Sequence, residues 1–165
     1  MSEIIIRDQD IRNLIRVMRV AGKDLATEMR KEIRVVAKPV ITDMQDTVQA
    51  LPMPASRGAT PYTGPTGPGG ISGRIAAAVK VQVAQSGVRI RVATGSLGNA
   101  KKLPGYMDAG VTWRHPVMGN RKAWVSQRAA RDGWFSKTGI EHHPKIRRQV
   151  MEILTRYATQ LAARL

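Results

Sequence analysis

Apolar residues recur at helical spacing in two long segments of the chain. From Ile11 to Leu51 they follow one another in steps of mostly three or four, which predicts a long amphipathic helix. Pro39 interrupts this helix and predicts a kink or a break near residues 36–38, because proline lacks the backbone N–H. Pro144 suits a first helical turn and predicts that a second helix begins there. The apolar stripe of that helix consists of Ile146, Val150, Ile153, Leu154, Tyr157, Leu161 and Leu165.

Between the two helices, alternation of apolar and polar residues predicts strands. Residues 3–7 read as a short β-branched strand ahead of the first helix, and residues 71–78 as a short helical turn. Residues 79–83 and 88–92 alternate strictly and are joined by a connector of hairpin length. One face of this hairpin is then basic and exposed, while its valines and Ile90 face the helices. The polar positions are Lys80, Gln82, Arg89 and Arg91.

The segment Pro52 to Gly70 offers almost no side chain to a core. It holds five of the nine prolines and five of the fifteen glycines. We expect a flexible arm that becomes ordered against a neighbouring subunit, with Arg57 and Tyr62 among its contacts.

The order of these elements predicts an α+β fold. The long N-terminal helix and the C-terminal helix would pack on one face of an antiparallel sheet. A chain of 165 residues suits one domain, so we expect residues 1–165 to form a single unit with the arm at residues 52–70.

Charge is distributed unevenly along the chain, whose net charge is +15. Residues 1–51 carry nine Lys or Arg against eight Asp or Glu, whereas residues 52–165 carry eighteen against four. Such a polycation attracts nucleic acid or acidic protein surfaces, without distinguishing between them. The longest apolar runs are too short to cross a bilayer and no signal peptide is recognisable, so we expect a soluble, non-exported protein without a membrane partner.

Few residues are suited to catalysis. The chain has no cysteine, and residues 52–165 contain no close pair of carboxylates of the kind that metal-dependent nucleases use. His115, His142 and His143 are a conceivable metal site, but adjacent histidines rarely point at one metal and their spacing matches no zinc pattern. We interpret His142-His143 as a turn that leads into the second helix and His115-Pro116 as extended backbone. We therefore expect no enzymatic activity, no cofactor and no small-molecule substrate.

The stretch VTWRHPVMGNRKAWV, residues 111–125, combines two tryptophans with three Lys or Arg residues, one histidine and no acid. Its His-Pro and Gly-Asn pairs are typical of a tight connection between strands. We expect Trp113 and Trp124 to anchor the two ends of this connection in the core. The basic side chains Arg114, Arg121 and Lys122 would then project outward.

A family resemblance rests on this stretch and on the residues that follow it. Trp113 to Arg121 (WRHPVMGNR), Trp124 to Gln127 (WVSQ) and Gly133 to Phe135 (GWF) resemble a pattern in tail-completion, or head-tail joining, proteins of long-tailed bacteriophages, especially those of actinobacteria. The order of elements is similar over nearly the whole chain. Met118 departs from the pattern, where an aromatic residue is more usual.

The resemblance implies a structural virion protein, assembled in the host cytoplasm and located at the neck or the top of the tail. Such a protein forms a homo-oligomeric ring around the channel through which DNA leaves. Resemblance to tail-top proteins implies six copies, whereas a portal-side connector would match twelve. Neighbouring connector and tail-tube proteins would be its partners. The expected interface residues with a subunit, a partner or DNA are Arg57, Tyr62, Lys80, Arg89, Arg91, Arg114, His115, Arg121 and Lys122.

The alternative function follows from charge alone. A basic protein that binds DNA without sequence preference, as an accessory to DNA packaging, is compatible with the excess of Lys and Arg in residues 52–165. No helix-turn-helix, zinc-finger or RNA-binding motif is present to support sequence-specific recognition.

Overall fold

The computed structural model describes residues 3–6, 23–52, 70–84, 87–117 and 120–163. Its elements confirm the predicted α+β class. The helices are α2 (Lys23–Ala50), α3 (Ile71–Ala78), α4 (Leu103–Asp108) and α5 (Ser136–Ala162), with a 3-10 segment η1 (Thr94–Ala100). The strands are β1 (Glu3–Ile6), β2 (Val79–Ala84), β3 (Gly87–Val92), β4 (Trp113–Val117) and β5 (Asn120–Gln127).

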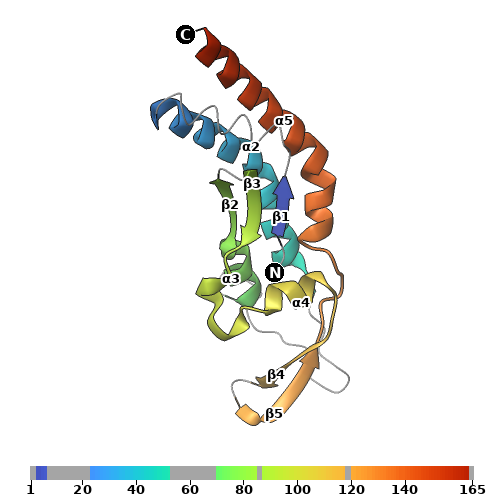
Figure 1. Cartoon of the computed structure of the whole chain (residues 1–165). Coiled ribbons are helices and arrows are strands. Elements are labelled where there is room, and N and C mark those ends of the chain that lie inside the picture. Colours follow the sequence, from blue (N-terminus) through green and yellow to red (C-terminus); the bar gives the residue numbers. More distant parts are fainter. Residues whose placement is uncertain (1–2, 7–22, 53–69, 85–86, 118–119, 164–165) are drawn as a thin grey trace.

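The strands form two antiparallel sheets instead of the single sheet that was expected. One sheet has the order β1-β3-β2, and the other consists of β4 and β5 alone. The strands separate because residues 94–108, between the two hairpins, fold into η1 and α4 and carry the chain away from the first sheet. In Figure 1, α2 and α5 approach one end of an elongated molecule and the β4–β5 hairpin lies at the other end, with the three-stranded sheet between them.

The core lies between α2, α5 and the inner face of the three-stranded sheet. The predicted stripe of α2 is buried along its length, from Leu25 through Ile33 and Met44 to Val48. The stripe of α5 is buried from Ile146 to Tyr157. Each fully buried large apolar side chain contributes about 1.5–3 kcal/mol relative to its exposed state, so these stripes dominate the stability of the body.

Both prolines lie inside helices. Helix α2 continues through Pro39, so a kink is the remaining alternative to the break that does not occur there. Helix α5 begins at Ser136 with Pro144 inside it, so the predicted helix start is wrong. Each proline leaves the carbonyl four residues earlier without its helical partner. Those positions, Val35 at 69% exposure and Ile140 at 70%, lie on the solvent face, where water can hydrogen-bond the carbonyl.

Polar contacts join α2 to α5 and show that the two helices are antiparallel. Near the start of α2, Glu32 forms an ion pair with Arg156 and accepts a hydrogen bond of 2.9 Å from the hydroxyl of Tyr157. Near the end of α2, Asp43 pairs with His142 at 2.7 Å. The prediction that His142 and His143 form a turn before the helix is wrong. Both lie within α5, since the helix starts several residues before them.

Candidate interaction surface

The stretch that carries the family resemblance forms the β4–β5 hairpin. Trp113 pairs with Gln127, Arg114 with Ser126, His115 with Val125, and Pro116 with Trp124. Beyond Pro116 the register shifts, because β5 carries extra residues at its tip end. The two expected strands are confirmed, whereas the residues that connect them, 118–119, lie outside the described residues.

Local hydrogen bonds hold the irregular tip of β5 in place. The side chain of Asn120 accepts a hydrogen bond of 3.0 Å from the backbone N–H of Lys122. The indole N–H of Trp124 donates to the carbonyl of Arg121 at 2.7 Å. A bulge of this kind bends a strand and re-aims its side chains, here Arg121 and Lys122.

The chain passes from the C-terminus of α4 into the hairpin through a glycine cap, and residues 109–112 of this connection are called the first foot of the hairpin. Gly110 has φ +63°, its N–H donates to the carbonyl of Met107 at 3.3 Å, and the N–H of Val111 donates to the carbonyl of Tyr106 at 3.1 Å. These two bonds and the left-handed glycine constitute a Schellman motif. The chain thus turns from α4 into β4 along one defined path.

Asp108 fixes the segment between β5 and α5, residues 128–135, which is called the second foot of the hairpin. Its backbone carbonyl accepts a hydrogen bond of 2.7 Å from Gly133, and its carboxylate oxygen Oδ1 accepts from the backbone N–H groups of Phe135 at 2.8 Å and Ser136 at 3.0 Å. The carboxylate therefore caps the N-terminus of α5, where a negative charge is favourable. The N–H of Ala130 adds a bond of 2.9 Å to the carbonyl of Pro52, after α2.

The two tryptophans of the hairpin have different environments. Trp113, at 8% exposure, belongs to the core as predicted, whereas Trp124 is 48% exposed, so its predicted core position is wrong. Pairing explains the difference, because Trp113 and His115 occupy one face of the ribbon and Arg114, Pro116 and Trp124 occupy the other. The first face turns toward the body and the second toward solvent.

His115 has a structural role within the ribbon. Its ring is half-buried, with Nδ1 at 3.2 Å from the carbonyl of Pro116 and Nε2 at 3.1 Å from Oε1 of Gln127. Both ring nitrogens are therefore engaged by the hairpin itself, which leaves this predicted interface residue little capacity for an external partner.

Cations surround the exposed face of the hairpin. Arg114, Arg121 and Lys122 are exposed, as predicted, and Arg128 and Arg131 are exposed at the second foot. Residues 109–131 contain no acid.

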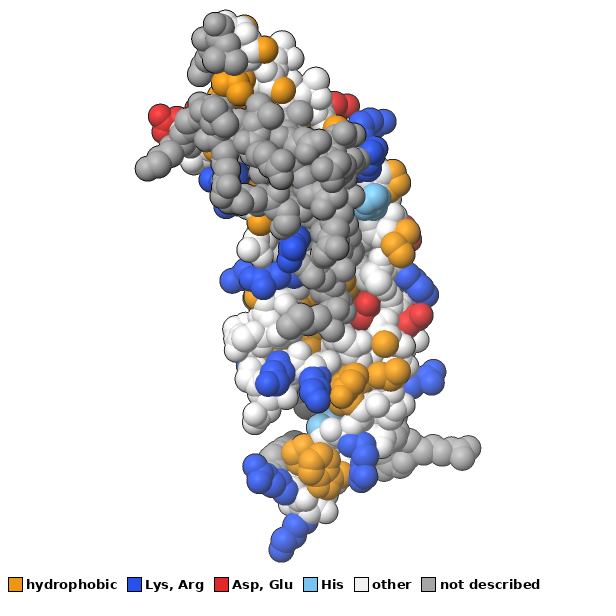
Figure 2. Space-filling model, in the orientation of Figure 1, with side chains coloured by type: hydrophobic (Ala, Val, Ile, Leu, Met, Phe, Trp, Pro, Cys, Tyr) orange, Lys and Arg blue, Asp and Glu red, His pale blue; other side chains and the backbone are white. Residues whose placement is uncertain are grey.

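The acids that flank this segment both have partners. Asp108 caps α5, and Asp132 forms an ion pair of 2.8 Å with Lys137. The hydrogen bond from Lys137 holds the pKa of Asp132 below its usual 3.8. Figure 2 shows the hairpin as an apolar patch flanked by Lys and Arg side chains.

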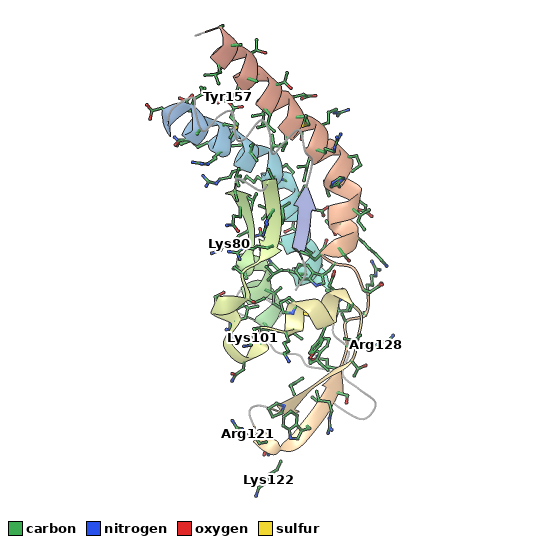
Figure 3. All side chains as sticks on the ribbon, in the orientation of Figure 1. Lys80, Lys101, Arg121, Lys122, Arg128 and Tyr157 are labelled. Atoms are coloured by element: carbon green, nitrogen blue, oxygen red, sulfur yellow. The ribbon has the colours of Figure 1, made fainter. Side chains whose placement is uncertain are left out.

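The basic face of the three-stranded sheet is a separate surface. Lys80 and Arg91 are opposite each other in the register and exposed, as predicted, while Arg89 is half-buried on the central strand β3. In Figure 3, Lys80 lies beside this sheet, whereas Arg121 and Lys122 lie at the far end of the hairpin. The structure thus distributes the predicted basic residues over two surfaces. The predicted contacts Arg57 and Tyr62, with most of the arm, lie outside the described residues.

The described residues include a cavity but no clustered metal-binding side chains. Among them, no group of three or more His, Asp or Glu side chains is placed to hold a metal ion. A cavity of about 280 Å³ between α2 and α5 is lined by Val36, Gln149, Glu152, Ile153 and Arg156. It contains no histidine and only one carboxylate. Within the same described ranges, no helix is long and apolar enough to cross a membrane.

Sequence reasoning missed two features of this surface. The cap by Asp108 joins residues that lie 27 and 28 positions apart, and no local pattern predicts it. The acid-free segment 109–131 was visible in the sequence as a charge pattern, and it would have added Arg128 and Arg131 to the predicted surface.

The fold and this surface define an α+β protein with a projecting basic hairpin. Comparisons with protein-family models, with curated proteins and with solved structures returned no match to the chain.

Proposed function

We propose that this protein is a structural component of a bacteriophage virion that joins the tail to the connector of the capsid. In this proposal, copies of the chain form a ring at the neck, with six copies implied by the resemblance, and the ring surrounds the DNA channel. Neighbouring neck and tail-tube proteins are its partners.

One observation carries the proposal. The residues that resemble head-tail joining proteins, Trp113 to Gln127, make up the hairpin that projects from the helical body, and its outer face presents Trp124 among cations. Exposed tryptophan and arginine are typical of surfaces that bind proteins or nucleic acid, and a ring around the DNA channel meets both. The capped feet hold this hairpin in a fixed direction, as an assembly contact requires.

Deletion of the gene, followed by electron microscopy of the lysate, tests the proposal. We expect filled heads and separate or defective tails to accumulate, with infectivity restored when the intact gene is supplied from a plasmid. Fully infectious particles that lack the protein would exclude a joining function.

The alternative, an accessory protein for DNA packaging, is favoured by the acid-free segment 109–131. The same deletion separates the two functions, because loss of a packaging factor leaves heads empty or partly filled. Loss of a joining protein leaves heads filled.

A further inference from the structure

We propose that the outer face of strands β4 and β5, with Arg121 and Lys122, binds the sugar-phosphate backbone of duplex DNA without sequence preference. This inference goes beyond a joining function, because it assigns a ligand to one surface of the chain. It is tested on the purified protein, independently of particle assembly.

The sign of the charge favours nucleic acid over protein as the ligand. Residues 109–131 carry Arg114, Arg121, Lys122, Arg128 and Arg131 and no acid. Surfaces that bind nucleic acid are much more positively charged than protein interfaces, whose centres are depleted in charge. A surface that carries positive charges and no negative ones fits a continuous line of phosphates.

Three of these cations are placed to reach a ligand. The side chains of Arg114, Arg121 and Lys122 are exposed, and none of them forms an ion pair or a hydrogen bond with a residue that the structure describes. The guanidinium group can bind a phosphate through two parallel hydrogen bonds. Figure 3 shows Arg121 and Lys122 at the end of the hairpin that is farthest from the helices.

The shape of the hairpin also suits a duplex. Two antiparallel strands lie about 4.8 Å apart, and the major groove of B-DNA, about 12 Å wide, admits a two-stranded ribbon. The five residues of β4 give the paired ribbon a length of roughly 17 Å. The ribbon can therefore place cations against the phosphates that border one groove.

Trp124 lies between the cations and adds apolar contact area. Because its indole N–H already donates to the carbonyl of Arg121, the ring can be covered by a sugar without leaving a donor unsatisfied. Trp113 and Trp134 are buried, so Trp124 is the exposed one of the three tryptophans. Its fluorescence therefore reports events at this surface.

A salt titration of the full chain with a fluorescently labelled duplex of about 20 base pairs tests the proposal. Three phosphate contacts predict a slope of about −2.7 for log K against log salt, or a loss of roughly 40-fold between 50 and 200 mM KCl. A variant with Arg114→Gln, Arg121→Gln and Lys122→Gln should lose most of this slope.

The matched control removes the same charge elsewhere. Arg30, Arg34 and Lys38 are exposed on α2, and replacing all three with Gln should keep the slope close to that of the wild type. Circular dichroism should show both variants to be folded. In addition, the duplex should protect Trp124 from quenching by acrylamide, and Trp124→Phe should remove the protected signal.

Three results would overturn the proposal. They are equal losses of affinity in the two triple variants, no binding at 50 mM KCl, or protection from acrylamide that persists in Trp124→Phe. Binding of the duplex by the hairpin variant with the affinity and slope of the wild type would likewise overturn it. If that variant also fails to join particles, the surface belongs to an acidic protein partner instead.

Discussion

Replacing Gly110 with alanine should loosen the hairpin at its first foot and destabilise the protein. Gly110 has φ +63°, and a Cβ atom built there would lie 3.0 Å from the Cβ of Asp132. The left-handed conformation costs a residue with a side chain about 1–2 kcal/mol, and the close contact adds to this cost. Gly105, in α4, is the matched control because a Cβ there meets nothing within 4 Å.

Gly110→Ala and Gly105→Ala should change the stability of the protein in opposite directions. Alanine is favoured over glycine in a helix by about 0.5–1 kcal/mol, so Gly105→Ala should stabilise the protein. For a domain of this size, 1 kcal/mol corresponds to about 2–4 °C in Tm. Gly110→Ala should therefore lower Tm by roughly 2–8 °C, and Gly105→Ala should raise it by about 1–4 °C.

Thermal unfolding followed by circular dichroism, with urea titration as a second measure, is the assay. If Gly110→Ala is as stable as the wild type, or shifts Tm upward as Gly105→Ala is expected to do, the glycine cap does not direct the chain into β4.

Three further predictions concern the body of the protein. Asp108→Ala removes the cap of α5 and should cost about 1 kcal/mol in the urea unfolding free energy; an unchanged value would show that the cap is dispensable. Ile33→Ala, at a position with 0% exposure, should cost about 2–5 kcal/mol, whereas Val35→Ala, at 69% exposure, should change stability by less than about 0.5 kcal/mol. Burial, and then the hydrogen bond to Glu32, raise the pKa of Tyr157 above its usual 10.0. Its neutral form is therefore favoured by folding, and this stability, fully present below pH 10.0, is lost as the pH rises through the raised pKa. Tyr157→Phe should weaken the alkaline loss of stability in urea titrations at increasing pH, and an identical alkaline loss in both proteins would contradict this.

Much of the fold could be predicted because its elements are encoded by periodic patterns. The helix at residues 71–78 and the β2–β3 hairpin, with Lys80 and Arg91 outward, lie where the pattern predicts them. These patterns are local, and burial of one face is enough to enforce them.

The wrong predictions concern features of the structure that depend on contacts between distant parts of the chain. The start of α5 was misplaced because its cap comes from Asp108 and not from a neighbouring residue. The exposure of Trp124 depends on which face of the ribbon meets the body, and the composition of the stretch carries no information about that. Pro39 is accommodated because the packing on both sides of it keeps α2 helical.

The central claim is that the hairpin is the contact through which this protein joins particles, and that the helix–sheet body serves as its scaffold. Complementation of the gene deletion with a variant carrying Arg114→Glu, Arg121→Glu and Lys122→Glu tests it most directly. We predict soluble, folded protein at the normal level together with filled heads and unattached tails. Normal numbers of infectious particles from this folded variant would contradict the claim.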